Sequence, residues 1–189
     1  MILLPLANSI SFNYNSFYPN IGGISLEGDA FSSSGVLHLT KNGKDDNLTY
    51  SVGRATYILP VHIWMARQET TDFTSISLLS EFDSYPNSWD PPYNHIGINI
   101  NSIESVAYCT GVGIFPTGTV VNAWVSYDST SRTLSAFANS EGENFSLSRL
   151  VDLREVLPEW ATIGISAATG ASIELHSILS WEFYSSLEN

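Results

Sequence analysis

The sequence predicts an all-β protein, a sandwich or a jelly roll, from three observations. Apolar side chains alternate with polar ones in several short runs, which is the pattern of strands with one buried face. Turn-forming residues separate these runs, for example in the segment Asp128–Arg132, which predicts a hairpin. Aromatic residues make up 12% of the chain and charged residues only 14%, a composition that favours strands over helices.

The alternating runs give the expected strands in order. Each strand is predicted to be half-buried. The alternating apolar residues of the five runs are Ile10, Phe12 and Tyr14; Leu37 and Leu39; Val61 and Ile63; Val121, Ala123, Val125 and Tyr127; Leu179, Trp181 and Phe183. The segment Asn42–Asp46 predicts an exposed loop. Only the stretch from Val151 to Leu157, which Pro158 closes, fits even a short helical turn.

The length of 189 residues suits a single domain, which we expect to span residues 8–189. Residues 1–7 are apolar and are either the remnant of a signal peptide or part of an ordinary first strand. The sequons Asn47-Leu48-Thr49 and Asn144-Phe145-Ser146 predict a glycoprotein of the secretory pathway, secreted or vacuolar. Triplets of this kind also arise by chance.

Charge and cysteine content exclude several classes of partner. Seven Lys and Arg residues against nineteen Asp and Glu residues give a formal net charge of -12, which repels nucleic acid and anionic membranes. The sequence has no apolar run of about eighteen residues, so we expect no membrane span. Cys109 is the only cysteine, which excludes an internal disulfide; it is an incidental thiol or, alternatively, forms an intermolecular disulfide.

The segment from Glu81 to His95 carries the chemistry. Glu81 and Asp83 are two residues apart, so on a strand their carboxylates project from the same face. Asn87 and Asp90 follow in a proline-rich loop, and His95 opens the next alternating run. Oxygen ligands suit Ca²⁺, and carboxylates with one imidazole suit a first-row ion such as Mn²⁺. The loop is therefore predicted to hold two ions; the alternative is a solvated acidic loop with a packed histidine.

At this loop the sequence resembles the legume lectins. The family signature is valine-glutamate-phenylalanine-aspartate-threonine, an aromatic residue, asparagine, tryptophan-aspartate-proline and histidine-isoleucine-glycine-isoleucine, and Glu81 to Ile98 follow it almost throughout. Further family blocks are Ser9–Asn13, Leu26–Ala30, Gly35–Thr40, Gly53–Tyr57, Val61–Trp64, Asn101–Ser105, Leu157–Trp160, Ala168–Ala171 and Leu179–Trp181. The resemblance implies an antiparallel jelly-roll sandwich, the concanavalin-like lectin fold, and a homo-dimer or tetramer.

The resemblance also implies roles for individual residues. The transition-metal ion, manganese, would be held by Glu81, Asp83, Asp90 and His95; calcium would be held by Asp83, the Tyr85 carbonyl, Asn87 and Asp90. Ser102 would hold a metal-bound water. Asn87 would bind a sugar hydroxyl and Tyr85 would stack on the sugar ring. Ala171 and Ser172 would line the loop that determines specificity.

Between Trp64 and Glu81 the sequence departs from the family pattern. The family has a longer segment there, with two further strands, an alanine-aspartate pair joined by a cis bond and a glycine-rich loop; this chain has only Met65–Ser80. The absent aspartate and glycine loop hold sugar in the family. The resemblance therefore implies the whole set of metal ligands but leaves carbohydrate binding open.

Two other functions compete with a calcium- and manganese-dependent lectin. A jelly-roll glycosidase needs a second glutamate two residues after the aspartate, and that position is Tyr85, so we expect no enzyme. A sugar-inactive defence or storage protein of the arcelin or amylase-inhibitor type shares the fold and has shortened loops. Those relatives tend to lose the metal ligands, which this chain keeps.

Overall fold

The computed structural model describes residues 9–43, 48–59, 61–62, 78–111, 114–115 and 118–186, without the side chains of Val61 and His62. The chain forms two compact units, residues 1–62 with 160–189, and residues 63–159. The prediction of one domain over residues 8–189 stays a prediction. Residues 1–7, Asn47 and most of Met65–Ser80 lie outside the described residues.

Strands are nearly the only regular secondary structure of the described residues, as the alternation predicts, and every described strand pair is antiparallel. The first unit contains β1 (Ser11–Tyr14), β2 (Ile24–Gly28), β3 (Phe31–Ser33), β4 (Val36–His38), β5 (Val52–Tyr57), β6 (Val61–His62), β13 (Trp160–Ala161), β14 (Gly164–Ala168), β15 (Ser177–Ile178) and β16 (Trp181–Tyr184). They pair as β1-β16, β13-β6, β14-β5-β2 and β15-β4-β3.

The core of the first unit forms around Phe17, Leu37, Leu39 and Ala55, which are almost completely buried. Partly buried aromatic and aliphatic side chains from β1, β2, β14 and β16 pack against these four residues. Chain segments from both ends of the sequence therefore share one core. The expected alternation is confirmed within β1 and β16, because alternate residues of both strands are partly buried. Leu179, which was expected to share the buried face of Trp181 and Phe183, is exposed.

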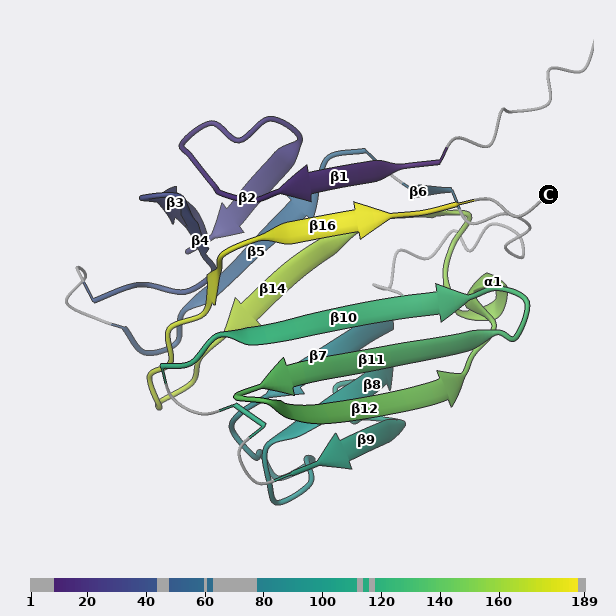
Figure 1. Ribbon diagram of the computed structural model, residues 1–189. Coiled ribbons are helices and arrows are strands. Elements are labelled where there is room, and N and C mark those ends of the chain that lie inside the picture. The colour runs from purple at the N-terminus through teal and green to yellow at the C-terminus, as the bar shows by residue number, and fades with distance from the viewer. Residues whose placement is uncertain are drawn as a thin grey trace, which may run out of the picture. The chain divides into compact units, whose positions relative to one another are not determined.

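The second unit is a pair of facing three-stranded sheets. One sheet has the order β7-β8-β9 and the other β10-β11-β12, and Figure 1 shows the second sheet in front of the first. The strands are β7 (Leu78–Asp83), β8 (His95–Ile100), β9 (Ala107–Thr110), β10 (Val121–Asp128), β11 (Thr133–Ser140) and β12 (Glu143–Leu150). Ile96 of β8 packs with Ala136 and Ala138 of β11 between the sheets, and this core supports the strands that carry the acidic loop.

Two local predictions for the second unit are confirmed. The hairpin turn between β10 and β11 is closed by Asp128, whose side chain accepts hydrogen bonds from the backbone N–H groups of Thr130 and Ser131 at 2.8 and 3.3 Å. The short helix is α1 (Leu153–Val156), and the Asp152 side chain accepts a hydrogen bond from the Arg154 N–H at its N-terminus. No described helix is long and apolar enough to cross a membrane.

The prediction for β10 is correct only in part. Val121 and Tyr127 are partly buried, but Ala123 and Val125, which alternate with the same period, are exposed. Among the described strands β10 lies at the edge of its sheet. Sequence period fixes which side chains share a face, whereas burial depends on what covers that face.

Candidate metal and carbohydrate site

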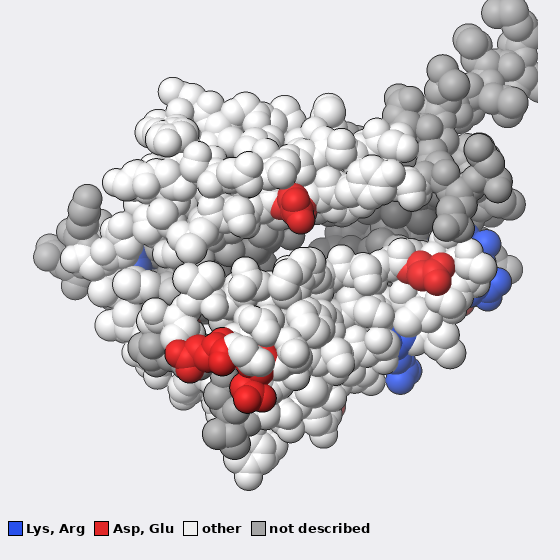
Figure 2. Space-filling view, in the orientation of Figure 1, with Lys and Arg blue, Asp and Glu red and all other residues white. Residues whose placement is uncertain are grey.

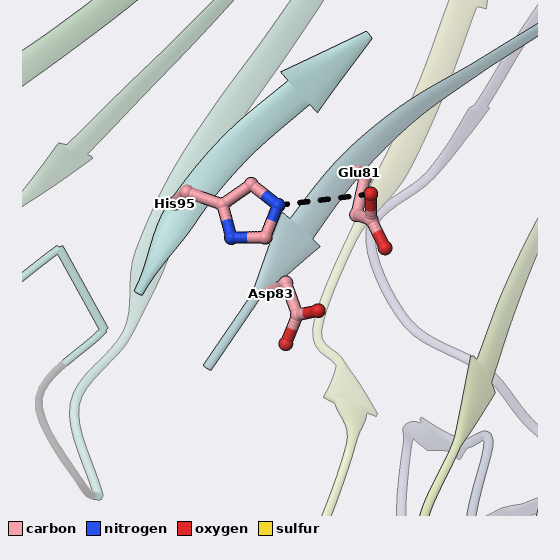
Figure 3. Close-up of side chains that lie close together, drawn as sticks. All are labelled: Glu81, Asp83 and His95. Carbon is pink, nitrogen blue, oxygen red and sulfur yellow. Dashed lines mark ion pairs between the residues drawn. The ribbon is translucent and has the colours of Figure 1, made fainter. Parts of the chain in front are cut away.

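The register of β7 against β8 brings three predicted metal ligands together. Asp83 lies opposite His95, and Glu81 lies opposite Gly97, so all four residues belong to the same face of the sheet. Figure 3 shows the His95 ring and the Glu81 carboxylate facing each other, with Asp83 beside them on the end of β7. One ligand atom from each lies within 4.8 Å of the others.

His95 is buried without a conventional partner. Its side chain is 0% exposed, and neither ring nitrogen has a hydrogen-bond partner among the described residues. The nearest charge is Glu81, whose Oε2 lies 3.8 Å from His95 Nε2; Tyr108 of β9 contacts the ring edge to face, with the ring centres 6.4 Å apart. Buried polar atoms nearly always find a partner, so a ring nitrogen of His95 is available to a ligand.

The hydrogen bonds to the Glu81 carboxylate come from neutral side chains. Burial raises the pKa of its carboxyl, and the charge of Asp83 raises it further; a hydrogen bond from Asn99, the nearby His95 and a hydrogen bond from Ser105 act in the opposite direction. Ser105 Oγ lies 3.3 Å from Glu81 Oε2 and 3.1 Å from Asn99 Oδ1. A divalent cation would favour the ionised carboxylate that burial and Asp83 disfavour.

Gly97 provides the space for this arrangement. A Cβ at this position would lie 2.1 Å from Ser105 Oγ and 3.2 Å from Glu81 Oε2. Both distances are shorter than ordinary van der Waals contact. A larger residue would therefore separate Ser105 from Glu81.

The loop after β7 is folded by its own polar side chains. Asp83 Oδ1 accepts a hydrogen bond from the Tyr85 N–H at 2.6 Å. Asp90 Oδ2 accepts two bonds from Asn87, from its backbone N–H at 2.8 Å and from Nδ2 at 2.9 Å. Asn87 Nδ2 also reaches the Tyr85 carbonyl at 3.4 Å. Both hydrogens of the Asn87 amide are thus engaged within the loop, and its Oδ1 is the atom left for a ligand.

The chemistry of these residues suits divalent cations. Asp90 Oδ1 is buried and has no hydrogen-bond partner among the described residues, as is true of the His95 nitrogens. Carboxylate, amide and imidazole donors that are oriented but unpaired are the atoms that Ca²⁺ and a first-row ion select. Asp90 is not part of the group formed by Glu81, Asp83 and His95. It is hydrogen-bonded to Asn87, and both of these residues are predicted calcium ligands.

The other predicted residues lie as follows. Ser102 is exposed, and its hydroxyl accepts a hydrogen bond from the Glu104 N–H at 3.0 Å; the hydroxyl beside Glu81 belongs to Ser105. Ala171 and Ser172 are exposed residues of the first unit. Asn144 is exposed on β12. Ser105, Asn99 and Gly97 were not predicted, and only their shared alternation with His95 along the chain could have indicated Gly97 and Asn99.

The loop also exposes three large aromatic rings. Tyr85 is 57% exposed, Trp89 48% and Tyr93 64%. Tyr85 was predicted to contact sugar, whereas Trp89 and Tyr93 were not. Exposed rings close to unpaired polar oxygens suit a ligand with an apolar face and hydroxyl groups.

Comparison with known proteins identifies the family of this chain. The family model of the legume lectin domain matches residues 9–80 and 78–189. The chain belongs to the legume lectin family. A seed lectin of Vatairea macrocarpa is 33% identical over 235 aligned positions, which cover 95% of this chain and 96% of the seed lectin. The resemblance of residues 81–98 is thereby extended to nearly the whole chain.

Solved structures of legume lectins show the same fold. Basic winged bean lectin with Tn-antigen superposes with a TM-score of 0.84 at 29% identity, covering 96% of this chain and all of that one (100%). Winged bean acidic lectin complexed with methyl-α-D-galactose gives the same TM-score of 0.84, at 29% identity and with the same 96% and 100% coverage. The jelly-roll β-sandwich is confirmed, and relatives that are lectins support a binding protein rather than an enzyme.

One comparison bears on the shortened segment. The 235 positions aligned with the Vatairea macrocarpa seed lectin exceed the 189 residues of this chain. That lectin therefore has residues without a counterpart here. The two matched segments of the family model meet at residues 78–80, next to the start of the acidic loop.

Proposed function

We propose that this legume lectin binds carbohydrate beside two divalent ions, calcium and manganese, held by the loop from Glu81 to His95. The observation that carries the proposal is the set of buried, unpaired ligand atoms, both nitrogens of His95 and Oδ1 of Asp90. Family membership supports it, because legume lectins generally bind metal ions and the chain has a matching group of ligands. The galactoside complex of winged bean acidic lectin supports carbohydrate as the ligand.

Each residue has a separate role in the proposal. Glu81, Asp83, Asp90 and His95 would hold manganese, and Asp83, the Tyr85 carbonyl, Asn87 and Asp90 would hold calcium. Bound ions supply positive charge that neutralises the carboxylates and fixes the loop. Ser105 and Asn99 orient Glu81 through hydrogen bonds. The hydroxyl near the manganese ligands is then Ser105 in place of Ser102.

The carbohydrate would meet the same loop from the solvent side. Asn87 would hydrogen-bond a sugar hydroxyl, and the exposed ring of Tyr85 would pack on the apolar face of the sugar. Ala171 and Ser172 are proposed as specificity residues. All three loop rings remain accessible in the described structure, so the loop offers stacking surface as well as polar atoms.

The test combines metal analysis with retention on immobilised sugars. Protein supplied with both ions should contain calcium and manganese by elemental analysis, and it should be retained by immobilised galactose, mannose or glycoprotein until a chelator is added. Asp90→Asn should lose calcium and retention together. Asp128→Asn is the matched control, because Asp128 caps a turn away from the loop, and it should behave as the wild type.

The results separate metal binding from carbohydrate binding. Protein without either ion would contradict the whole proposal. Protein that holds both ions but is retained by none of these sugars would instead be a sugar-inactive relative, the alternative that the unmatched residues of the Vatairea macrocarpa lectin favour. Amylase inhibition would then be the next assay.

Assembly and location complete the proposal. The chain is expected to form a homo-dimer or tetramer, which light scattering of the purified protein would measure. It is expected to follow the secretory pathway to the vacuole or outside the cell, with glycans at Asn47 and Asn144. Peptide mapping by mass spectrometry of protein from its natural tissue would check both sequons.

A further inference from the structure

The outer face of the β10–β12 sheet carries an aromatic row between two polar rows. Strand register aligns Trp124 with Phe137 and Phe137 with Ser146. The row on one side of the aromatic row consists of three asparagines, Asn122, Asn139 and Asn144. The row on the other side consists of three serines, Ser126, Ser135 and Ser148. The opposite face of these strands holds Ala136 and Ala138 in the core, so the three rows face solvent.

The aromatic row is accessible and uncharged. Trp124 is 51% exposed, and its ring packs on Phe137 with centres 5.2 Å apart and planes tilted by 51°. Figure 2 shows that the middle of this sheet carries neither acidic nor basic side chains, although acidic groups lie near the β11–β12 turn. In a chain of net charge -12, an uncharged face of aromatic, hydroxyl and amide groups suits a neutral sugar.

The sequon Asn144-Phe145-Ser146 opens onto this same face. Alternation along β12 buries Phe145 against the core and leaves Asn144 and Ser146 exposed. Asn139 Nδ2 donates to the Glu143 carbonyl at 3.3 Å and to Asn144 Oδ1 at 2.8 Å. Because Asn139 presents its nitrogen to both acceptors, the Asn144 amide turns its oxygen inward. Its Nδ2, the atom that a glycan would modify, is left toward solvent.

The aromatic row is within reach of a sugar on Asn144. Asn144 lies opposite Asn139, and Phe137 lies two residues further along the same strand. Diagonal neighbours of this kind are about 7–8 Å apart, which one or two sugar rings span, and Trp124 continues the surface beyond Phe137. We propose that the Trp124–Phe137 pair is the docking surface of an N-linked glycan carried by Asn144 of the same chain.

Covalent attachment of the glycan allows even a shallow face to bind it. A flat sheet surface buries little of a free sugar, so such a sugar would bind weakly. Covalent attachment raises the local concentration of the sugar to the order of millimolar or more. The bound state, in which the sugar stacks on the rings, is then populated even if the stacking is too weak to bind a free oligosaccharide. This inference does not depend on the metal loop, because Trp124, Phe137 and Asn144 belong to the β10–β12 sheet, whereas Glu81, Asp83 and His95 belong to the β7–β9 sheet.

The test compares glycosylated and unglycosylated protein from one secreting eukaryotic host. Intact mass should show a glycan on Asn144 in the wild type and none in Ser146→Ala, which destroys the sequon but keeps Asn144. Nuclear Overhauser contacts should join the first N-acetylglucosamine to the indole of Trp124 or the ring of Phe137. Acrylamide quenching of tryptophan fluorescence should be weaker in the glycosylated protein, and its melting temperature should be higher by roughly 2–4 °C.

Two tryptophan variants locate the effect. In Trp124→Ala the differences in quenching and melting temperature between the two glycoforms should disappear. In Trp160→Ala, the matched control with a ring 55% exposed, both differences should persist. Three results would overturn the proposal: an unmodified Asn144, a glycan without contacts to either ring, or unglycosylated protein that self-associates through Trp124.

Discussion

Replacing Gly97 by alanine should weaken metal binding without removing a single ligand atom. The new Cβ would lie 2.1 Å from Ser105 Oγ and 3.2 Å from both Ser105 Cβ and Glu81 Oε2. Ser105 must then move away and lose its contacts of 3.3 Å to Glu81 and 3.1 Å to Asn99. The single hydroxyl hydrogen of Ser105 is shared between these two acceptors, so at about 0.5–1.5 kcal/mol for one hydrogen bond the free energy of unfolding should fall by about 0.5–1.5 kcal/mol.

This loss should be visible in both stability and affinity. For a chain of this size it corresponds to a decrease in melting temperature of roughly 1–6 °C, followed by circular dichroism. Glu81 would lose the groups that orient it, so the dissociation constant for manganese should rise by roughly 10–100-fold, as competition with a fluorescent chelator would measure. The chelated protein should show the stability loss as well, because the contact between Gly97 and Ser105 involves no ion.

Gly170→Ala is the matched control. No heavy atom lies within 4 Å of a Cβ at Gly170, so this variant reports only the general effect of alanine on the unfolded chain. Removing the serine hydroxyl should reduce the clash, so Gly97→Ala should cost less stability in a Ser105→Ala background than in the wild type. Equal stabilities and equal manganese affinities of the Gly97 and Gly170 variants would refute the reasoning.

Three further predictions concern the ions, the histidine and pH. Removing both ions with a chelator should lower the melting temperature by roughly 11–22 °C if each was present at about a hundred times its dissociation constant; an unchanged melting curve would count against the metal site. His95→Leu should leave the chelated protein as stable as the wild type or more so, because leucine buries no unpaired nitrogen, while the rise in melting temperature on adding metal should shrink; a large loss of stability in chelated protein would contradict this. The hydrogen bond from Arg154 lowers the pKa of Asp152 from its ordinary value of 3.8 to about 2, so the stabilisation is complete above the higher value and is lost as pH falls through about 2. Thermal melts across this range should show wild type losing its advantage over Asp152→Asn as the solution becomes more acidic, and a constant difference would disprove the linkage.

The ligands of the metal loop could be predicted because their spacing encodes a strand. Glu81 and Asp83 are separated by one residue, so any extended backbone puts both carboxylates on one face. His95 starts the next alternating run, and a short proline-rich loop returns it beside Asp83. The pairing of Asp83 with His95 is the outcome expected from those two facts.

The supporting groups could not be predicted in the same way. Ser102 and Ser105 both follow β8 within a few residues, and sequence spacing does not tell which hydroxyl returns to Glu81. The structure selects Ser105, because the turn after β8 brings it over Gly97. The exposure of Ala123 and Val125 was also missed, because alternation indicates a shared face but not what covers it.

By itself, the sequence determined that the chain forms short antiparallel strands, that its acidic loop carries oxygen and imidazole donors, and that it is related to legume lectins. Those properties depend on residue type and on spacing along the chain. Only the tertiary structure decided that His95 and Asp90 are buried with unpaired atoms, that Ser105 supports Glu81, and that Asn144 shares a face with Trp124. Burial and cross-strand neighbours arise from contacts between residues far apart in sequence, and local spacing does not specify such contacts.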